Sequence, residues 1–359
     1  MVKLGELLKL MVTKNASDLI LKVGSKPVFR IYGELFRIED HPVVEAEDTM
    51  NVAKNILTEE QFQNFIATNE SDVAVNVPNL SRFRINFMRQ RRTVAIVFRR
   101  IPQEIPKLED GYPPILKDFA MRPRGLVLVT GPSGCGKSTT IAAMVEYRNK
   151  REPCHIITIE DPIEFVFKND KASIDQREVG RDTRAFANAL KYSLRQDPDV
   201  IVVGEMRDLE TISLAITAAE TGHLVLSSLH TNNAVETIDR VIDVFPPFQQ
   251  RQIRLQMSSN LVGVVSQILL KKKDGSGVIP AFEIMVSIAA VRKLIREAKT
   301  HQIPSVMQTR TKEGMKTMNM SLLELVTKGV ITLADALNVS PEPEELEEMF
   351  NKVEKVKEV

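Results

Sequence analysis

The sequence predicts an α/β protein with an α+β N-terminal domain, a second domain built on a parallel sheet, and a set of C-terminal helices. Residues 1–100 mix helical spacing with alternating strands, from Gly125 short apolar runs alternate with helical stretches, and after about residue 286 only helical patterns remain. Alternation of strands and helices is typical of a parallel sheet covered by helices. The predicted boundaries are an N-terminal domain at 1–100, a linker at 101–115, a second domain at 116–286 and a helical region at 287–359.

The N-terminal domain is predicted to be a strand-rich unit with three helices. Its most regular segment, RFRINFMRQ at 82–90, alternates polar and apolar residues as a half-buried strand does. Four prolines between Pro102 and Pro114 disfavour a helix and indicate an extended linker. The other predicted elements are an opening helix, strands at 17–23, 27–32, around 35, 72–77 and 93–100, and two helices within 45–68.

The second domain is predicted from apolar runs that do not alternate. Such runs are typical of strands that are buried on both faces of a parallel sheet. The predicted strands are GLVLVT, HIITIE, VIVVG and HLVLSSL, and the predicted helices run to about 148, over 183–196 and over 208–221.

Composition favours a reducing compartment and gives no sign of a nucleic-acid partner. Lys plus Arg (48) nearly equals Asp plus Glu (47), whereas nucleic-acid proteins carry a basic footprint. The only cysteines, Cys135 and Cys154, supply no disulfide framework. The N-terminal Leu4, Leu7 and Leu8 follow helical spacing, and no apolar run reaches membrane-spanning length. We therefore expect a cytoplasmic protein.

The strongest motif is a phosphate-binding loop at 131–138. Its sequence GPSGCGKS matches G-x-x-x-x-G-K-[ST], follows a predicted strand and opens a predicted helix. Backbone N–H groups of such a loop surround phosphates, Lys137 should reach the β- and γ-phosphates, and Ser138 should ligate Mg²⁺. ATP and Mg²⁺ are thus the expected cofactors. The expected nucleotide-binding residues are Ser133, Gly134, Cys135, Gly136, Lys137, Ser138 and Thr139.

Acidic residues end two predicted strands of the same sheet. Glu205 follows VIVVG, and the cluster EDPIE at 160–164 ends HIITIE. Parallel strands bring such side chains to one edge, where ligands bind. One carboxylate would hold the hydrated metal and another would orient or deprotonate the attacking water. The alternative is that the EDPIE acids merely cap a helix.

Two histidines bracket the next predicted strand. His223 and His230 enclose LVLSSL, and His230 opens a polar HTNN turn. The strand that they flank should end at the same edge, and we expect His230, and with it His223, to act as γ-phosphate sensors, with a structural role as the alternative. Within the sequence, no Cys/His cluster has zinc spacing, so no structural metal is expected.

These motifs together resemble the secretion ATPases of type II secretion systems and type IV pili. The matching segments are the phosphate loop, TIEDPIE at 158–164, QREVG at 176–180, DPDVIVVGEMRD at 197–208 and TAAETGHLVLSSLHTNNA at 217–234. AAVRKLIRE at 289–297 resembles the A-I-R-N-L-I-R-E motif of the retraction ATPases, departing from it at Val291 and Lys293. The resemblance extends over nearly the whole chain.

The resemblance implies a PAS-like N-terminal domain, a RecA-like P-loop ATPase domain and assembly as a homohexamer. It makes Glu164 the general base and Glu205 a member of the Mg²⁺–water shell, with Glu160 and Asp161 beside the nucleotide. It gives His223 and His230 a part in nucleotide sensing. Arginines on the N-terminal strands are expected to act as fingers, and the candidates by position are Arg82, Arg84 and Arg99.

The implied function is ATP hydrolysis that drives type IV pilus retraction and twitching motility. The implied partners are an inner-membrane pilus platform protein, at which the cytoplasmic ring would sit peripherally, and a paralogous retraction ATPase. An accessory retraction motor of the PilU type stays open as an alternative. Less favoured are a pilus-assembly or type II secretion ATPase, a DNA translocase, a small-molecule kinase and a scaffold that only binds ATP.

The retraction-like segment is predicted to be an amphipathic helix. Val291, Leu294, Ile295 and Ala298 share one apolar face at i, i+3, i+4 and i+7, and Ser287 is the predicted N-cap. This helix either packs passively on the core or passes ATP-driven movement to the pilus platform.

Overall fold

The computed structural model describes residues 3–78, 80–101 and 104–357. The chain divides into two compact units. The first unit comprises Met1–Glu104 together with the short segment Pro162–Val166, and the second comprises Ile105–Asp161 with Phe167–Val359. The second half of the acidic cluster EDPIE therefore belongs to the first unit, although it lies within the sequence of the second.

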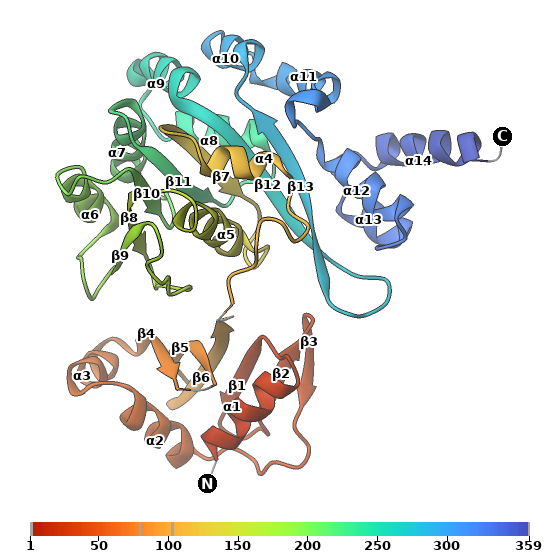
Figure 1. The fold of residues 1–359 in the computed structure, drawn as a ribbon. Coiled ribbons are helices and arrows are strands. Elements are labelled where there is room, and N and C mark those ends of the chain that lie inside the picture. Colours follow the sequence, from red (N-terminus) through yellow and green to blue (C-terminus); the bar gives the residue numbers. More distant parts are fainter. Residues whose placement is uncertain (1–2, 79, 102–103, 358–359) are drawn as a thin grey trace. The chain divides into compact units, whose positions relative to one another are not determined.

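The first unit is an antiparallel sheet with helices on one face (Figure 1). Along β5, Phe83, Ile85 and Phe87 are buried while the residues between them are half-buried, which confirms the alternation predicted for this strand. The buried side chains form one core with those of the helices, including Leu7 and Phe65. The strands lie in the order β3-β2-β1-β6-β5-β4. Their bounds are β1 Asp18–Lys22, β2 Val28–Ile31, β3 Glu34–Arg37, β4 Glu70–Val77, β5 Ser81–Gln90 and β6 Thr93–Ile101, and the helices are α1 Leu4–Thr13, α2 Ala46–Ile56 and α3 Glu59–Thr68.

The second unit has a seven-stranded sheet in the order β13-β12-β7-β11-β10-β8-β9. All neighbouring strands are parallel except β12 and β13, which form an antiparallel pair. Every residue of β7, β10 and β11 is buried, as expected for strands covered on both faces. The bounds are β7 Gly125–Thr130, β8 His155–Glu160, β9 Ser173–Glu178, β10 Val200–Val203, β11 Leu224–Leu229, β12 Leu261–Lys271 and β13 Val278–Val286.

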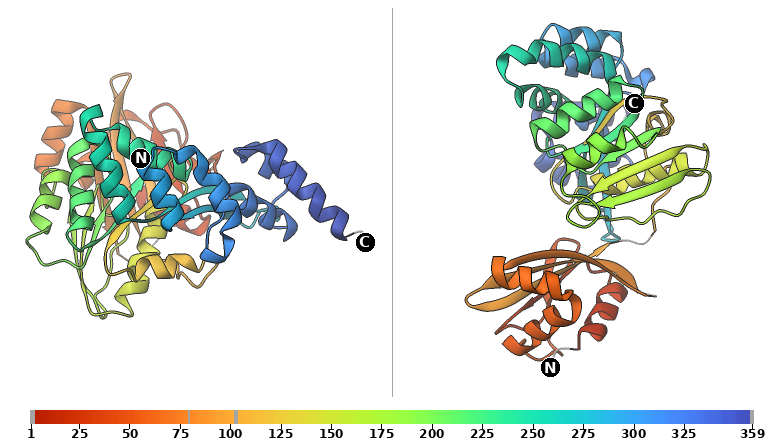
Figure 2. Two further views of the ribbon diagram at one scale, coloured as in Figure 1. Left: turned by 90° about the horizontal axis from the view of Figure 1, so that it is seen from above. Right: turned by 90° about the vertical axis from the view of Figure 1, so that its left-hand side faces the viewer.

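Helices cover both faces of this sheet. The chain crosses from β7 to β8 through α5 and later returns in the opposite direction, so the right-handed crossover rule places α5 on one face and α6–α9 on the other. The contacts agree, because α4 packs on α5 whereas α6 packs on α7, and α7 and α8 both pack on α9 (Figures 1 and 2). The bounds are α4 Ile115–Ala120, α5 Lys137–Asn149, α6 Phe186–Ser193, α7 Leu209–Glu220, α8 Ala234–Asp243 and α9 Pro247–Asn260.

The C-terminal region is helical, as predicted. Helices α12, α13 and α14 pack around Leu322 and Leu346 and form a core of their own against Leu270 and Ala281 of the β12–β13 hairpin. Across the ranges that the structure describes, no helix combines the length and apolar character needed to cross a membrane. The helices are α10 Ala289–Arg296, α11 Ile303–Thr309, α12 Met318–Thr327, α13 Leu333–Val339 and α14 Pro343–Lys357, with 3₁₀ turns at Thr300–Gln302 and Thr311–Glu313.

Two details of α10 differ from the sequence prediction. The helix ends at Arg296, and Ala298 follows it with a φ of 56°, so Ala298 does not belong to the apolar face. The N-cap is Ile288, which makes no side-chain cap, and Ser287 is buried one residue earlier. The helix starts one residue later than predicted because Ser287, just after β13, still donates its backbone N–H to the carbonyl oxygen of Val262 on β12.

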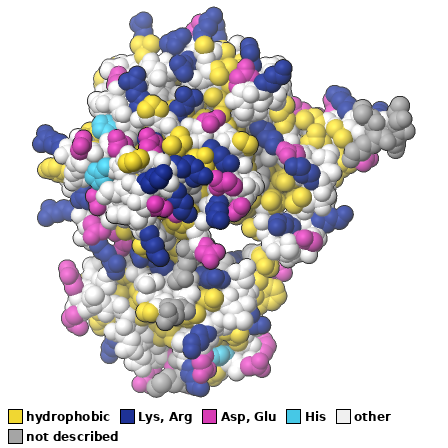
Figure 3. All heavy atoms as spheres, in the orientation of Figure 1, with side chains coloured by type: hydrophobic (Ala, Val, Ile, Leu, Met, Phe, Trp, Pro, Cys, Tyr) yellow, Lys and Arg dark blue, Asp and Glu magenta, His cyan; other side chains and the backbone are white. Residues whose placement is uncertain are grey.

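Charged side chains of both signs are interspersed on the surface view in Figure 3, in keeping with the near-zero net charge.

Candidate active site

The phosphate loop has a conformation that requires glycine. Gly131, Gly134 and Gly136 have φ values of 139°, 78° and 91°. A Cβ at Gly131 would lie 2.2 Å from the backbone oxygen of Gln267 and 2.7 Å from the sulfur of Cys135. The loop therefore keeps its tight curve only with glycine at this position.

The loop delivers its anion-binding groups to the start of α5. This 13-residue helix begins at Lys137, so its first unpaired N–H groups face the loop and favour negative charge. Ser133, Gly134 and Ser138 are exposed, and Thr139 is half-buried. Cys135 is buried, and burial raises the pKa of its thiol more than the charge of Lys137 lowers it. It therefore fills space as a neutral thiol.

Lys137 is held against the loop and against His230. Its ammonium donates to the carbonyl oxygens of Gly131 at 2.8 Å and Pro132 at 3.0 Å, and lies 3.3 Å from Nδ1 of His230. An ammonium can only donate, so Nδ1 of His230 accepts and the proton of the ring is on Nε2. The lysine is 8% exposed, so these contacts hold a buried positive charge in place.

His230 connects the lysine to Glu205. Its Nε2 lies 3.3 Å from Oε1 of Glu205, whose Oε2 lies 2.7 Å from the guanidinium of Arg207. Burial alone would raise the pKa of the Glu205 carboxyl, but the hydrogen bond from Arg207, followed by the electrostatic effects of His230 and Arg207, outweighs burial and lowers this pKa. Glu205 is thus an ionised carboxylate. The strand order explains the cluster, because β7, β11 and β10 are consecutive and end at the same edge.

The first acids of the EDPIE cluster lie at that edge too. Oε1 of Glu160 accepts from the hydroxyl of Thr158 at 2.7 Å and from the amide of Gln176 on β9 at 3.1 Å. Asp161 is exposed, and its charge contributes to the raised pKa of Arg207, after the larger effect of Glu205. The edge therefore gathers Lys137, His230, Glu205 and Asp161 from four consecutive strand ends.

Glu164 belongs to a different unit of the chain from these four residues. It lies in Pro162–Val166, the segment that belongs to the first unit, and it is half-buried. Its assignment as the general base therefore rests on the sequence motif.

His223 lies at the opposite end of β11 from His230. Its carbonyl accepts from the N–H of Gly125, the first residue of β7, and its Nδ1 lies 3.0 Å from the carbonyl oxygen of Ala218. Six strand residues lie between the two histidines, so seven steps of about 3.3 Å separate them by about 23 Å. The strand that they flank does end at the shared edge, but within a single chain it carries only His230 there, because the residue that precedes a parallel strand lies at the amino edge.

The three candidate arginine fingers share one face of the first unit's sheet. Arg82 and Arg84 are two residues apart on β5, and Arg99 lies opposite Arg84 on β6. Arg84 makes a two-pronged ion pair with Asp72 at 2.6–3.1 Å, and Nε of Arg99 donates to Asp18 at 2.8 Å. Arg84 and Arg99 are thus paired locally within the unit.

Two residues of the site were not singled out from the sequence. Arg207 lies two positions after Glu205, and Gln176 is the first residue of the QREVG motif. Within the described residues, no group of three or more His, Cys, Asp or Glu side chains forms a metal cage. Mg²⁺ needs no such cage where phosphate oxygens and water complete its shell.

The fold is of the mixed α/β class, with a phosphate-loop sequence motif at the carboxyl edge of its mainly parallel sheet. The chain belongs to the type II/IV secretion system protein family, whose model matches residues 5–277, and within it to the pilus retraction ATPases. It is 47% identical to the type IV pilus retraction ATPase PilT of Pseudomonas aeruginosa over 340 residues, covering 94% of this chain and 98% of PilT. It is 40% identical to the type IV pilus ATPase PilU of the same organism over 333 residues, covering 92% of this chain and 87% of PilU. A crystal structure of the pilus retraction motor PilT with bound ADP superimposes with a TM-score of 0.87 and 46% identity, over 97% of this chain and all of that one.

Proposed function

We propose that this chain is a hexameric motor that hydrolyses ATP to drive type IV pilus retraction and twitching motility. One observation carries the proposal: Lys137, His230 and Glu205 form a continuous chain of contacts at the mouth of a complete phosphate loop. That arrangement puts a cation, a hydrogen-bonding ring and an ionised carboxylate where a γ-phosphate and its metal would lie. Membership in the family of pilus retraction ATPases supports the coupling of this hydrolysis to mechanical work on a pilus.

The residues at the edge divide the work of hydrolysis between them. Lys137 exchanges the carbonyl oxygens of Gly131 and Pro132 for phosphate oxygens, which neutralises charge that builds up during phosphoryl transfer. Glu164 takes the proton of the attacking water. His230 reports the γ-phosphate through its contacts with Lys137 and Glu205. In a ring, the His223 of each chain would sense nucleotide from the far end of β11.

The site suits Mg²⁺ as well as ATP. The exposed hydroxyl of Ser138 at the start of α5 would be a direct ligand of the metal, and the ionised Glu205 would hold water of its shell. Bound Mg²⁺ would neutralise phosphate charge. Both residues offer hard oxygen donors, which is the donor chemistry that this metal prefers.

The two units fit the architecture of a ring motor. We assign the first unit as a PAS-like domain and the second as a RecA-like ATPase core followed by a helical region. In a homohexamer, Arg82, Arg84 and Arg99 would act as fingers toward a nucleotide, with the ring in the cytoplasm against an inner-membrane platform protein. A role as the primary retraction motor is favoured over that of a PilU-type accessory because the identity to PilT is higher than to PilU. A paralogous retraction ATPase is the further expected partner.

Gel filtration combined with phosphate release tests the enzymatic half of this proposal. A hexamer that releases phosphate from ATP and Mg²⁺ without any acceptor is expected. A monomer that consumes ATP only with an acceptor would instead indicate a small-molecule kinase, and salt-dependent binding to DNA would indicate a translocase.

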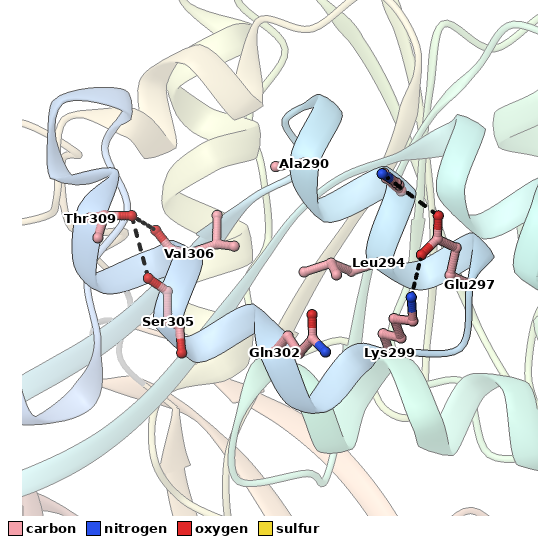
Figure 4. Close-up of a pocket in the computed structure, with 9 residues that line it drawn as sticks. Ala290, Leu294, Glu297, Lys299, Gln302, Ser305, Val306 and Thr309 are labelled. Atoms are coloured by element: carbon pink, nitrogen blue, oxygen red, sulfur yellow. Dashed lines mark hydrogen bonds and ion pairs between the residues drawn. The ribbon is translucent and has the colours of Figure 1, made fainter.

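Helix α10 is the proposed output of the motor. Val291 and Ile295 are fully buried, whereas Leu294 lines a groove between α10 and α11 with a volume of about 550 Å³ (Figure 4). On its rim, Glu297 contacts Lys299 at 2.8 Å and Lys293 at 3.9 Å. Lys293 and Lys299 therefore flank the groove that Leu294 lines, and the exposed Arg296 adds a further cation to α10, which suits contact with the pilus platform.

The exposed Arg296 tests this coupling more cleanly than Arg292, whose Nε holds the carbonyl oxygen of Ser287. We expect Arg296→Ala to keep hexamers and ATP hydrolysis near normal while pilus retraction fails. Arg310→Ala, which removes another exposed arginine of the same unit, is the matched control. Normal retraction with Arg296→Ala would refute the coupling role, and a parallel loss of hydrolysis would reduce α10 to a support of the fold.

A further inference from the structure

Gln267 is a fully buried amide that lies directly behind the phosphate loop. It belongs to β12, which pairs in parallel with β7 so that Ser266 lies beside Thr130, the last residue before the loop. The hydroxyls of Ser266 and Thr130 are 2.7 Å apart, which ties the two strands together at this level. Gln267 is 2% exposed and follows immediately, level with Gly131.

Both polar groups of the Gln267 side chain bind the loop and its helix. Its Nε2 donates to the carbonyl oxygen of Cys135 at 2.5 Å, and its Oε1 accepts from the hydroxyl of Thr140 at 2.8 Å. The orientation of the amide is fixed, because a carbonyl cannot donate and the Cys135 contact must therefore involve the NH₂ group. One side chain thus spans the loop and the first turn of α5.

The backbone of Gln267 also shapes the loop. Its carbonyl oxygen occupies the space where a Cβ of Gly131 would lie, and its Nε2 would be 3.2 Å from a Cβ of Gly136. The loop is therefore packed tightly on this residue at its beginning, at Cys135 and at Thr140. A buried glutamine is costly unless its amide is hydrogen-bonded, and here both the NH₂ group and the carbonyl of the side chain have a partner.

We propose that Gln267 is a positioning residue for nucleotide binding: it holds the phosphate loop in the curved form whose backbone N–H groups surround the phosphates. Gln267 does not face the nucleotide itself and acts through the Cys135 carbonyl and the Thr140 hydroxyl. This inference rests on the proposed function insofar as the loop binds ATP. In a loop that is already curved, binding does not have to order the backbone, so affinity is gained before any chemistry begins.

The test is a titration of the purified full chain with ADP and Mg²⁺, together with KM and kcat for ATP. Gln267→Met keeps the volume and the apolar packing but removes the hydrogen bonds that Gln267 makes to the Cys135 carbonyl and the Thr140 hydroxyl. We expect ADP to bind about tenfold or more weakly and KM to rise by a similar factor, with a much smaller change in kcat, because the lost interactions serve ground state and transition state alike.

Asn319→Leu is the matched control. Asn319 is an equally buried amide whose partners are Glu342, Glu345 and Ser340 in the C-terminal helices. It should lower thermal stability and leave ADP affinity unchanged. Equal losses of ADP affinity in both variants would mean that Gln267 only supports the fold, and wild-type affinity in folded Gln267→Met would overturn the proposal.

Thr140→Val with Thr140→Ser provides a second arm in case Gln267→Met does not fold. Serine keeps the hydroxyl that Gln267 accepts from, so it should retain ADP affinity, whereas valine should weaken it by severalfold. Identical ADP affinities of the two variants would contradict the proposed role of the hydrogen bond between Gln267 and Thr140. Because the readout is ADP binding, failure of the wild-type chain to hydrolyse ATP would count against the proposed function and would leave this test standing.

Discussion

The carboxyl edge of the second unit's sheet and the polar face of the first unit's sheet both gather charges, but in different ways. At the edge, β7, β11, β10 and β8 end side by side, so Lys137 and Glu205 are brought together in a partly buried place where pKa values shift. On the face, an antiparallel ladder spaces Arg84 and Arg99, and each finds an acidic partner within the same sheet. Charges at the edge are therefore grouped around the phosphate loop, whereas Arg84 and Arg99 on the face are held by acidic partners in the single chain and would act on a nucleotide only in the assembled ring.

Among the substitutions predicted for the two regions, removal of the Lys137 side chain should have the largest effect on ATP hydrolysis. Lys137→Ala eliminates the one cation that the structure places inside the described part of the loop, so we expect ATP hydrolysis to fall below detection. Phosphate release at saturating ATP measures this. Substantial residual turnover would show that the phosphate charge is met elsewhere, and mixing the variant into wild-type hexamers should inhibit more than in proportion if subunits share sites.

Glu164→Gln should slow hydrolysis while ATP stays bound. Loss of a general base costs about 10²–10⁴-fold in rate, whereas the neutral amide leaves the phosphate contacts intact. Single-turnover hydrolysis and ATP binding are measured on the same preparation. Glu160→Gln is the comparison variant, because Glu160 already accepts from Thr158 and Gln176. If Glu164→Gln hydrolysed ATP at the wild-type rate while Glu160→Gln hydrolysed it more slowly, Glu160 would be the general base instead.

The two histidines offer an internal comparison along one strand. His230→Ala removes the bridge between Lys137 and Glu205 and should lower kcat by roughly 10- to 100-fold, since hydrogen bonds to charged groups are among the stronger ones. His223→Ala should change the kcat of a dilute, unassembled chain by less than about twofold. Equal losses in the unassembled chain would contradict the separation of the two ends of β11. A loss for His223→Ala that appears only in hexamers would favour its sensing role across the ring.

The smallest effect is expected on the polar face. Arg84→Ala breaks an ion pair whose partners are about a third exposed, and such pairs contribute at most about 1 kcal/mol to the free energy of unfolding. Chemical denaturation of the purified chain measures it. If Arg84→Ala lowered the free energy of unfolding by more than about 3 kcal/mol, the charges on the face would be as tightly organised as those at the edge. The contrast drawn between the two regions would then not hold.

Much of the edge could be predicted from the sequence because its signals are local. The phosphate loop lies between a six-residue apolar run and a helix, and Glu205 directly follows another apolar run. The direction of β11 was the missing step for His223, because residues that bracket a parallel strand go to opposite edges.

Other features could not be found from local patterns. Strand β9, with the sequence SIDQRE, is polar and has no apolar periodicity, so only its pairing with β8 makes it a strand. The grouping of Pro162–Val166 with the first unit depends on contacts between distant parts of the sequence. Gln267 did leave a signal: a single amide inside the apolar run of β12 requires partners, and this strand was not recognised.

Pilus retraction in the source organism, after deletion of this gene, tests the central claim most directly. Fluorescently labelled pili should still extend but should not retract, and they should accumulate on the cell surface. The wild-type chain should restore retraction, and Lys137→Ala, present at the same level, should not. Unchanged retraction after the deletion, or full restoration by Lys137→Ala, would contradict the account.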